Sequence, residues 1–240
     1  MSTSIPDLAD IFEASTDLEE LPPRFNVAPT DSIPIILDRG RGRRIETFRW
    51  GLIPSRTGTP EGLPLMINAR AESVDSRPSF RGLLAGRRCV VPADGFYEWR
   101  TEMGRRQPYF IRHRDRRPLA FAGLWDDWTG AGGTTRSCTI ITTDANDLLR
   151  PLHDRMPVVL EPEALRRWLD PTLDDFDRLR DSLVPAPWKP LEAFPVSPRM
   201  NRVAEDDARC LEPLGPAIRE PPDWAGRPTS GREPDQLALF

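Results

Sequence analysis

The segment from Arg88 to Trp99 constrains the fold more than any other part of the chain. Its apolar run Cys89-Val90-Val91 is typical of a buried strand, Pro92 is expected to end that strand, and Asp94-Gly95 predicts a turn. After the turn, three aromatic side chains surround a single carboxylate, Glu98. This carboxylate is either an outward-facing strand residue or a partly desolvated acid whose raised pKa lets it transfer protons near neutral pH.

Length and composition predict one domain over residues 1–215, followed by a disordered tail over 216–240. The chain has 240 residues, of which 38% are hydrophobic, and this is sufficient for a packed core. After about Glu212 the sequence becomes polar and rich in proline, as disordered segments are. We find no signal peptide and no apolar run long enough to cross a membrane. A cytoplasmic protein is therefore expected.

The number and spacing of the cysteines argue against disulfide bonds and a zinc site. Cys89, Cys138 and Cys210 are odd in number and lack metal-ligand spacing, so reduced, mostly buried thiols are expected. We predict no metal and no other cofactor.

Periodicity and capping residues predict several elements. Ser4 is a helix N-cap, and the helix is expected to end near Ser15. Residues 33–37 and 45–50 form a predicted hairpin. In the predicted strand 66–72, alternation places Asn68, Arg70 and Glu72 on one face. Further helices are expected over 162–169 and 172–183, whereas His113 is expected at the surface.

Charge is strongly segregated. The net charge is −4, yet residues 39–117 contain 18 Arg and only 8 acids, and every basic residue except Lys189 is Arg. Arginine binds phosphate through planar bidentate contacts and stacks on bases, so this segment suits a groove for single-stranded nucleic acid. General use of Arg in place of Lys explains the surplus equally well.

Eight short motifs occur in a fixed order between about residues 4 and 215. They are Asn26-Val-Ala-Pro-Thr30, Trp50-Gly-Leu-Ile-Pro54, Asn68-Ala-Arg-Ala-Glu72, Ser79-Phe-Arg81, the Arg88–Trp99 segment, Phe121-Ala-Gly-Leu-Trp125, Ile141-Thr-Thr143 and Leu152-His-Asp-Arg-Met-Pro157. Together they resemble the SRAP family of abasic-site processing proteins. The resemblance implies an α+β fold with a mixed, partly barrel-like β core and peripheral helices.

The resemblance also implies a reaction and a partner. Family members bind single-stranded DNA that carries an abasic site and become covalently joined to it, which shields the lesion during replication. An N-terminal amine attacks the sugar aldehyde to give an imine, and the thiol of an N-terminal Cys then closes a thiazolidine ring. This implies a crosslinking or lyase-like enzyme, with a peptidase activity that removes the initiator Met. By the same resemblance, we expect a monomer associated with the nucleoid or replication fork.

By resemblance, each site residue has an implied role. Asn68 would hold the N-terminus and the sugar, Glu98 would transfer protons, and His153 would assist that transfer. The implied phosphate and base contacts with DNA come from Arg70, Arg81, Arg155, Trp50, Pro54, Met156, Asn26 and Pro29.

The first residues depart from the family pattern. The chain begins Met1-Ser-Thr-Ser4, without the Cys-Gly-Arg expected after the initiator Met. Three explanations remain: a start assigned several codons late, a variant without its nucleophile, or a Ser2 amine that forms an imine but only a less stable oxazolidine. Two rival functions remain open with them, a non-covalent DNA-binding module and a peptidase limited to self-processing.

The last five residues resemble the short peptide by which bacterial repair proteins bind the sliding clamp. In such peptides, apolar side chains fill a pocket and a Gln forms hydrogen bonds beside it. The residues that match are Gln236, Leu237, Leu239 and Phe240. An arbitrary apolar terminus is the alternative.

Overall fold

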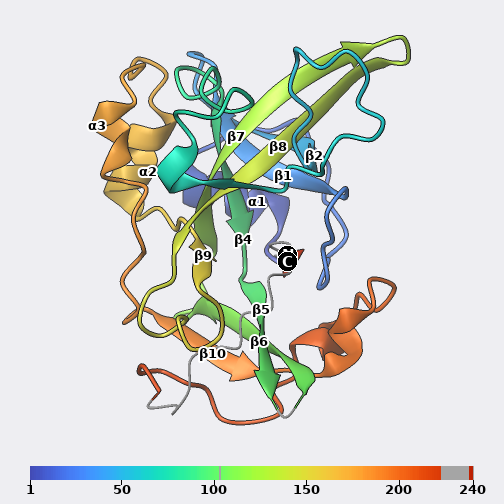
Figure 1. Cartoon of the computed structure of the whole chain (residues 1–240), viewed down its shortest axis with the longest axis vertical. Helices are drawn as coiled ribbons and strands as arrows, with labels where there is room; N and C mark the ends of the chain where they lie inside the picture. The colour runs from blue at the N-terminus through green and yellow to red at the C-terminus, as the bar shows by residue number, and fades with distance from the viewer. Residues whose placement is uncertain (103, 223–237, 240) are drawn as a thin grey trace.

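A closed β-barrel forms the larger part of the protein. The computed structural model describes residues 1–102, 104–222 and 238–239 (Figure 1). The barrel strands are β1 (Ser32–Asp38), β2 (Arg43–Trp50), β4 (Arg88–Ala93), β7 (Leu119–Gly130) and β8 (Gly133–Asp144). They pair in the order β2-β1-β4-β7-β8, and β8 also pairs with β2, which closes the ring. The predicted α+β class with a barrel-like core is thus confirmed.

Two further strands extend one end of β8. The strand β3 (Asn68–Arg70) lies parallel to β8, with Asn68 opposite Ile140. The strand β9 (Arg155–Pro157) pairs with β8 antiparallel, with Arg155 opposite Asp144. The predicted strand 66–72 is therefore too long, because a 3₁₀ helix, η1 (Ala71–Ser73), follows Arg70 and contains Glu72.

The barrel strands carry apolar residues on both faces, so both the inside and the outside of the barrel are covered. In β1, Ile35 and Leu37 belong to the cluster that includes Phe48, whereas Ile36 belongs to a second cluster that includes residues of the helices. Because alternate side chains of a strand point to opposite faces, both faces of β1 are buried. The helices therefore cover the outside of the barrel.

Three α-helices pack on this outer surface. The helix α1 (Ile5–Phe12) begins where the Ser4 hydroxyl accepts a hydrogen bond from the Asp7 amide at 3.2 Å, as predicted. It ends at Phe12, earlier than predicted, because Glu13 adopts a left-handed conformation. The helix α2 (Pro162–Leu169) has the predicted bounds.

The third helix, α3 (Asp177–Arg180), is much shorter than the predicted 172–183. Asp170 and Asp175 each accept a hydrogen bond from the backbone amide two residues ahead, at 2.9 and 3.0 Å. These local side-chain bonds compete with helix formation, so the chain turns before the helix begins. The predicted inward residues Leu179 and Leu183 are nevertheless buried.

A small second sheet lies against one end of the barrel. Its strands, in the order β10-β6-β5-β11, are β10 (Leu191–Pro195), β6 (Arg105–His113), β5 (Phe96–Glu102) and β11 (Ala238–Leu239). Chain from β4 enters β5 through Asp94-Gly95. A Cβ at Gly95 would lie 2.3 Å from the Ile111 carbonyl oxygen, so this close approach requires glycine.

The strand β4 continues through Pro92 to Ala93, so the prediction that Pro92 ends it is wrong. Pro92 pairs with Ala120 of β7, whereas β1 pairs only with Cys89 and Val90. On the β1 side the ladder has already ended, and a residue without an amide hydrogen is tolerated there.

The packed part of the chain extends slightly beyond residue 215. The Ile218 amide bonds to the Ala193 carbonyl at 2.6 Å, and the Arg219 guanidinium pairs with Glu192 at 3.0 Å. Cys89, Cys138 and Cys210 are free and buried, as predicted. In the described part of the chain, no helix combines the length and apolarity that a membrane span requires.

Candidate active site

Glu98 points from the small sheet toward the barrel. Its residue surface is 4% exposed. In a strand, Phe96 and Glu98 share a face, and Phe96 packs in the same core cluster as Leu152, which precedes His153, and Met156, which follows it by three residues. Glu98 is therefore a buried carboxylate on the face toward the His153 segment, and the outward-facing alternative is wrong.

The two aromatic neighbours of Glu98 lie on the opposite face of β5. Tyr97 is buried in a cluster with Phe110 and Phe194, against which Trp99 packs. The Tyr97 hydroxyl donates a hydrogen bond to the Phe25 carbonyl at 3.0 Å. These aromatic side chains anchor β5 from behind and fix the direction in which Glu98 points.

Asn68 and His153 come from the two segments that flank the end of β8. Asn68 begins β3 on one side, and His153 lies two residues before β9 on the other. The His153 Nδ1 accepts a hydrogen bond from the Arg155 amide at 3.0 Å, so the other ring nitrogen, Nε2, is the one directed away from its own backbone. The barrel therefore positions both predicted catalytic side chains through one strand.

Arg155 connects these two flanking segments. Its guanidinium forms two hydrogen bonds with the Glu72 carboxylate, both at 2.9 Å, and one with Asp144 at 2.8 Å. It also donates to the Thr142 carbonyl at 2.7 Å. Burial would raise the pKa of Glu72, but the bonds from Arg155 hold it below its ordinary value. Arg155 is thus engaged within the protein.

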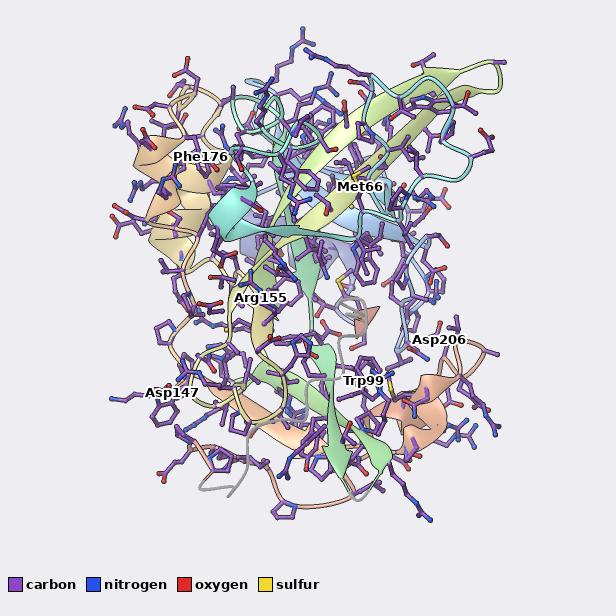
Figure 2. All side chains as sticks on the ribbon, in the orientation of Figure 1. Met66, Trp99, Asp147, Arg155, Phe176 and Asp206 are labelled. Carbon is purple, nitrogen blue, oxygen red and sulfur yellow. The ribbon has the colours of Figure 1, made fainter. Side chains whose placement is uncertain are left out.

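Figure 2 shows one labelled residue from each of the two sheets that border this region. Arg155 lies at the end of the barrel, and Trp99 lies across from it in the small sheet. The predicted site is therefore a junction between the two sheets rather than a feature of one.

The remaining predicted DNA contacts divide into accessible and buried groups. Arg70 and Arg81 are exposed, and Pro29 and Pro54 are half-buried, so these four can meet a ligand. Trp50 and Met156 are completely buried. The Trp50 indole donates to the Ile67 carbonyl at 3.1 Å, so it packs in the core and offers no face to a base.

Asn26 is also structural in this fold. It is 3% exposed, and its amide donates hydrogen bonds to the carbonyls of Met200, Arg202 and Glu205 at 2.8–3.1 Å. Its motif therefore holds a loop against η2 (Pro198–Asn201). We withdraw direct DNA contact for Asn26, Trp50 and Met156, because motif order carries no information about burial.

The N-terminus is held beside the turn between β4 and β5. Asp94 accepts hydrogen bonds from the Ser2 amide at 2.5 Å and from the Thr3 hydroxyl at 2.5 Å. The Met1 amine donates to the Arg24 carbonyl, and burial lowers the pKa of this amine to about 5 despite the nearby carboxylates of Asp94 and Asp206.

Sequence reasoning missed Asp94 as an anchor of the N-terminus. Its only sequence signal was the Asp-Gly pair, which also predicts an ordinary turn. Burial would raise the pKa of Asp94, but hydrogen bonds from Thr3 and Ser2 lower it below its ordinary value. Ser2 and Thr3 are consequently held by the same turn that leads into β5.

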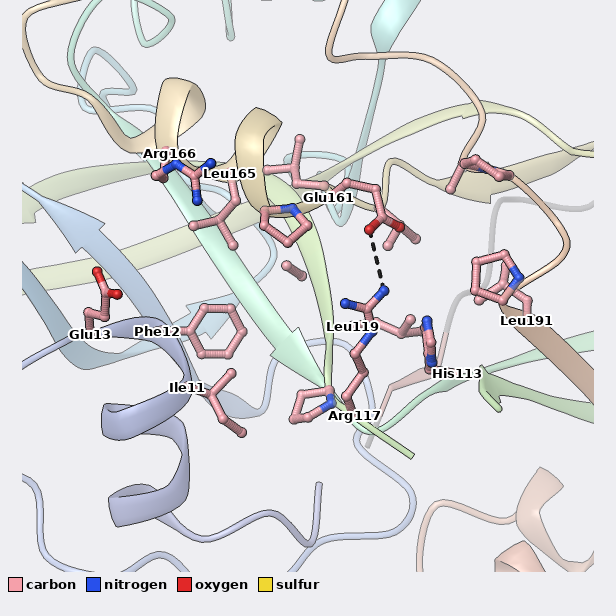
Figure 3. A pocket seen from close by; sticks show the side chains of 18 of the residues that line it. Ile11, Phe12, Glu13, His113, Arg117, Leu119, Glu161, Leu165, Arg166 and Leu191 are labelled. Carbon is pink, nitrogen blue, oxygen red and sulfur yellow. Dashed lines mark hydrogen bonds and ion pairs between the residues drawn. The ribbon is translucent and has the colours of Figure 1, made fainter. Parts of the chain in front are cut away.

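A cavity of about 270 Å³ lies elsewhere, between α1, α2 and the turn after β6 (Figure 3). It is bordered by the Arg117–Glu161 ion pair at 3.3 Å and by His113, which is 8% exposed and not at the surface as predicted. None of the predicted site residues lines this cavity. A second cavity of about 210 Å³ contains Met1, Thr3 and Arg24 and lies beside the N-terminus.

Across residues 1–102, 104–222 and 238–239, no group of three His, Cys, Asp or Glu side chains could hold an ion. Burial also raises the pKa of Cys89, Cys138 and Cys210, which opposes thiolate formation.

The sequence and the fold both match known proteins. Residues 1–203 match the family model described as SOS response associated peptidase (SRAP). The abasic site processing protein YoqW of Bacillus subtilis is 40% identical over 195 residues, which cover 80% of this chain and 87% of that protein. The abasic site processing protein HMCES of Gallus gallus is 34% identical, covering 80% of this chain and 66% of its own length.

Crystal structures support the same relationship. A protein from Bacteroides thetaiotaomicron has a TM-score of 0.76 at 28% identity, covering 82% of this chain and 90% of its own. A protein from Bordetella bronchiseptica has a TM-score of 0.64 at 31% identity, covering 79% and 94%.

Proposed function

The chain belongs to the SOS response associated peptidase (SRAP) family, and from this premise we propose that it processes abasic sites in single-stranded DNA by covalent attachment. The attachment joins the N-terminal residue to the aldehyde of the ring-opened sugar. The observation that carries the proposal is the buried Glu98, on the strand face directed toward the segment that contains His153.

In the proposed reaction, the amine nitrogen attacks the aldehyde carbon and forms a carbinolamine, which loses water to give an imine. Glu98 as carboxylate accepts the proton of the sugar hydroxyl when the ring opens, while His153 donates one to the ring oxygen. Glu98 as acid then protonates the hydroxyl that leaves the carbinolamine. Asn68 holds the sugar and the N-terminus through its amide.

The N-terminal residue decides how stable the adduct is. With Ser2 at the N-terminus, the reaction stops at the imine or a weak oxazolidine. With an N-terminal Cys, its thiol adds to the imine carbon and closes a thiazolidine without a leaving group. The location of the N-terminus at the β4–β5 turn supports attachment through this residue in either case.

DNA binding is proposed for the accessible part of the predicted set. Arg70 and Arg81 contact phosphates, and Pro29 and Pro54 pack against bases. Arg155 reaches a phosphate only by releasing Glu72 or Asp144, so we assign it first to holding β9 and η1 together.

The test is adduct formation with an abasic single-stranded oligonucleotide, measured on a denaturing gel with and without borohydride. Two chains are compared: this one, and one that carries Met-Cys-Gly-Arg and a short spacer before Ser2. Borohydride converts only an imine into a permanent link. We expect a trapped adduct with this chain and a borohydride-independent adduct with the extended chain.

Glu98→Gln should slow adduct formation by about 100-fold or more, the usual contribution of a general acid–base. Glu161→Gln, which changes a carboxylate beside the distant cavity, is the matched control and should leave the rate unchanged. If neither chain forms an adduct while both bind the oligonucleotide, the protein is a non-covalent DNA-binding module.

We further propose that the C-terminal peptide binds the bacterial sliding clamp. Gln236, Leu237 and Phe240 lie outside the described residues, and Leu239 belongs to β11, so support comes from the sequence match. Replacing Leu239 and Phe240 by Ala should abolish binding to immobilised clamp. Unchanged clamp affinity would contradict this proposal.

A further inference from the structure

The strand β11, near the end of the chain, occupies part of the outer edge of β5. β11 pairs with β5 antiparallel, with Ala238 opposite Tyr97 and Leu239 opposite Phe96. In Figure 1 the red strand β11 lies in the middle of the molecule, between the barrel and the small sheet. This pairing brings the end of the sequence to the strand that carries Glu98.

On its other side, β5 is paired with β6 along its whole length, from Phe96 to Glu102. Within the described residues, β11 is the single strand paired with the outer edge. An edge strand presents a row of backbone donors and acceptors, to which another extended segment can add. The edge therefore has the chemistry of a docking site for an extended peptide.

This docking position adjoins the candidate active site. Phe96 and Tyr97 directly precede Glu98, so a strand paired with them lies beside the proposed catalytic carboxylate. The same turn that leads into β5 also holds the N-terminal residues through Asp94. Residues 2–3 and 238–239 thus lie beside β5 and the turn that leads into it.

We propose that the strand β11 (Ala238–Leu239) docks on the outer edge of β5 and covers the active site when no DNA or protein partner is bound. The effect of docking on the reaction rests on the proposed function, whereas the docking itself does not. Because the peptide is tethered to the domain, its effective concentration is high, and a short strand is enough to hold it most of the time.

The docked residues are also part of the predicted clamp-binding peptide. A backbone paired with β5 cannot simultaneously bind a pocket on another protein. Clamp binding would therefore withdraw the peptide and open the site, which would couple activity to the presence of the replication machinery. The same argument applies to any partner that binds residues 236–240.

Deuterium exchange of backbone amides tests the docking directly. We compare the full chain with a chain that ends at Pro222 and with an Ala238→Pro/Leu239→Pro variant. Adjacent residues of a strand direct their amides to opposite sides, so one of the two prolines must remove an amide that faces β5. Ala238→Thr/Leu239→Thr keeps both amides and is the matched control.

Truncation and the double proline should increase exchange in the peptide that covers residues 94–99, whereas the threonine control should not. A synthetic peptide of residues 232–240, added to the truncated chain, should restore protection. Equal exchange in all chains would overturn the docking, whatever the result of the DNA experiments.

The rate of borohydride-trapped adduct formation tests the covering. The truncated chain and the double proline should react about 3- to 10-fold faster than the full chain, because a site that is covered most of the time has a reduced competent fraction. If amide exchange changes but the rate of adduct formation does not, the peptide docks on β5 but does not cover the active site. Absence of adduct in every chain would instead overturn the proposed function, and exchange would still decide the docking.

Discussion

The barrel and the small sheet solve the problem of strand edges differently. In the barrel, pairing of β2 with β8 closes the ring, and the added strands β3 and β9 extend it. The small sheet stays open, and its β5 edge takes up the C-terminal residues instead. Closure makes the barrel a rigid support, whereas the open edge leaves β5 accessible to other segments.

This difference assigns separate tasks to the two regions. The barrel positions Asn68 and His153 around β8, and the small sheet supplies Glu98. The two-residue turn Asp94-Gly95 joins them.

Trp50→Ala should have the largest effect on stability. The indole is fully buried in the barrel, so its removal should lower the free energy of unfolding by about 3–5 kcal/mol. Urea unfolding measures this, with Pro54→Ala as a mild control. A loss of DNA affinity at unchanged stability would instead support the base-stacking role predicted from the sequence.

Gly95→Ala should disturb the joint between the two regions. The new Cβ would lie 2.3 Å from the Ile111 carbonyl oxygen, so we expect a loss of about 1–3 kcal/mol from overpacking. At Gly82, an added Cβ meets no atom within 4 Å, so Gly82→Ala is the matched control. Equal stability of the two variants would show that β5 can shift relative to β4.

Arg155→Met should loosen the end of the barrel. It leaves the Glu72 and Asp144 carboxylates without their shared cation, and because both are at least half exposed we expect a loss of only about 1–2 kcal/mol. The chain has two histidines, so imidazole NMR signals can be assigned with His113 as internal reference. We expect the chemical shift of the His153 signal to change. An unchanged shift would contradict a role of Arg155 in positioning His153.

Asp94→Asn should lower the free energy of unfolding by about 1 kcal/mol near neutral pH, and this loss should depend on pH. The pKa of Asp94 lies below its ordinary value of 3.8 in the folded protein, so its contribution is present above that value and is lost as pH falls through the folded pKa. The difference in unfolding free energy between the two chains should be largest at pH 6–7 and shrink below about pH 4. A constant difference would mean that the Asp94 charge is not involved.

The sequence predicted local elements well where the signal was local. Ser4 as N-cap, the β1–β2 hairpin and the bounds of α2 all follow from capping, turn chemistry and apolar spacing. It failed where side chains bond to their own backbone, as Asp170 and Asp175 do before α3. Such bonds depend on individual rotamers, which periodicity does not contain.

The sequence selected candidate site residues, but it did not predict which of them are exposed to solvent. Motifs selected Glu98, and the structure places it on a buried face. The same reasoning selected Trp50 and Asn26, whose polar atoms bond within the core and loops. Whether a polar or aromatic residue meets solvent depends on strands that pair across long stretches of sequence, which no single motif encodes.

Closure of the barrel also determines the order of events during synthesis. The parallel contact between Trp50 and Cys138 joins residues that leave the ribosome far apart in time. Until Cys138 emerges, the finished β1–β2 hairpin has an unpaired edge and an exposed apolar face. Such non-local pairing slows folding, because a long loop must close before its contacts form. Until β8 has been synthesised, the unpaired edge of β2 therefore makes the nascent chain prone to aggregation, whereas in the folded barrel this edge is paired with β8.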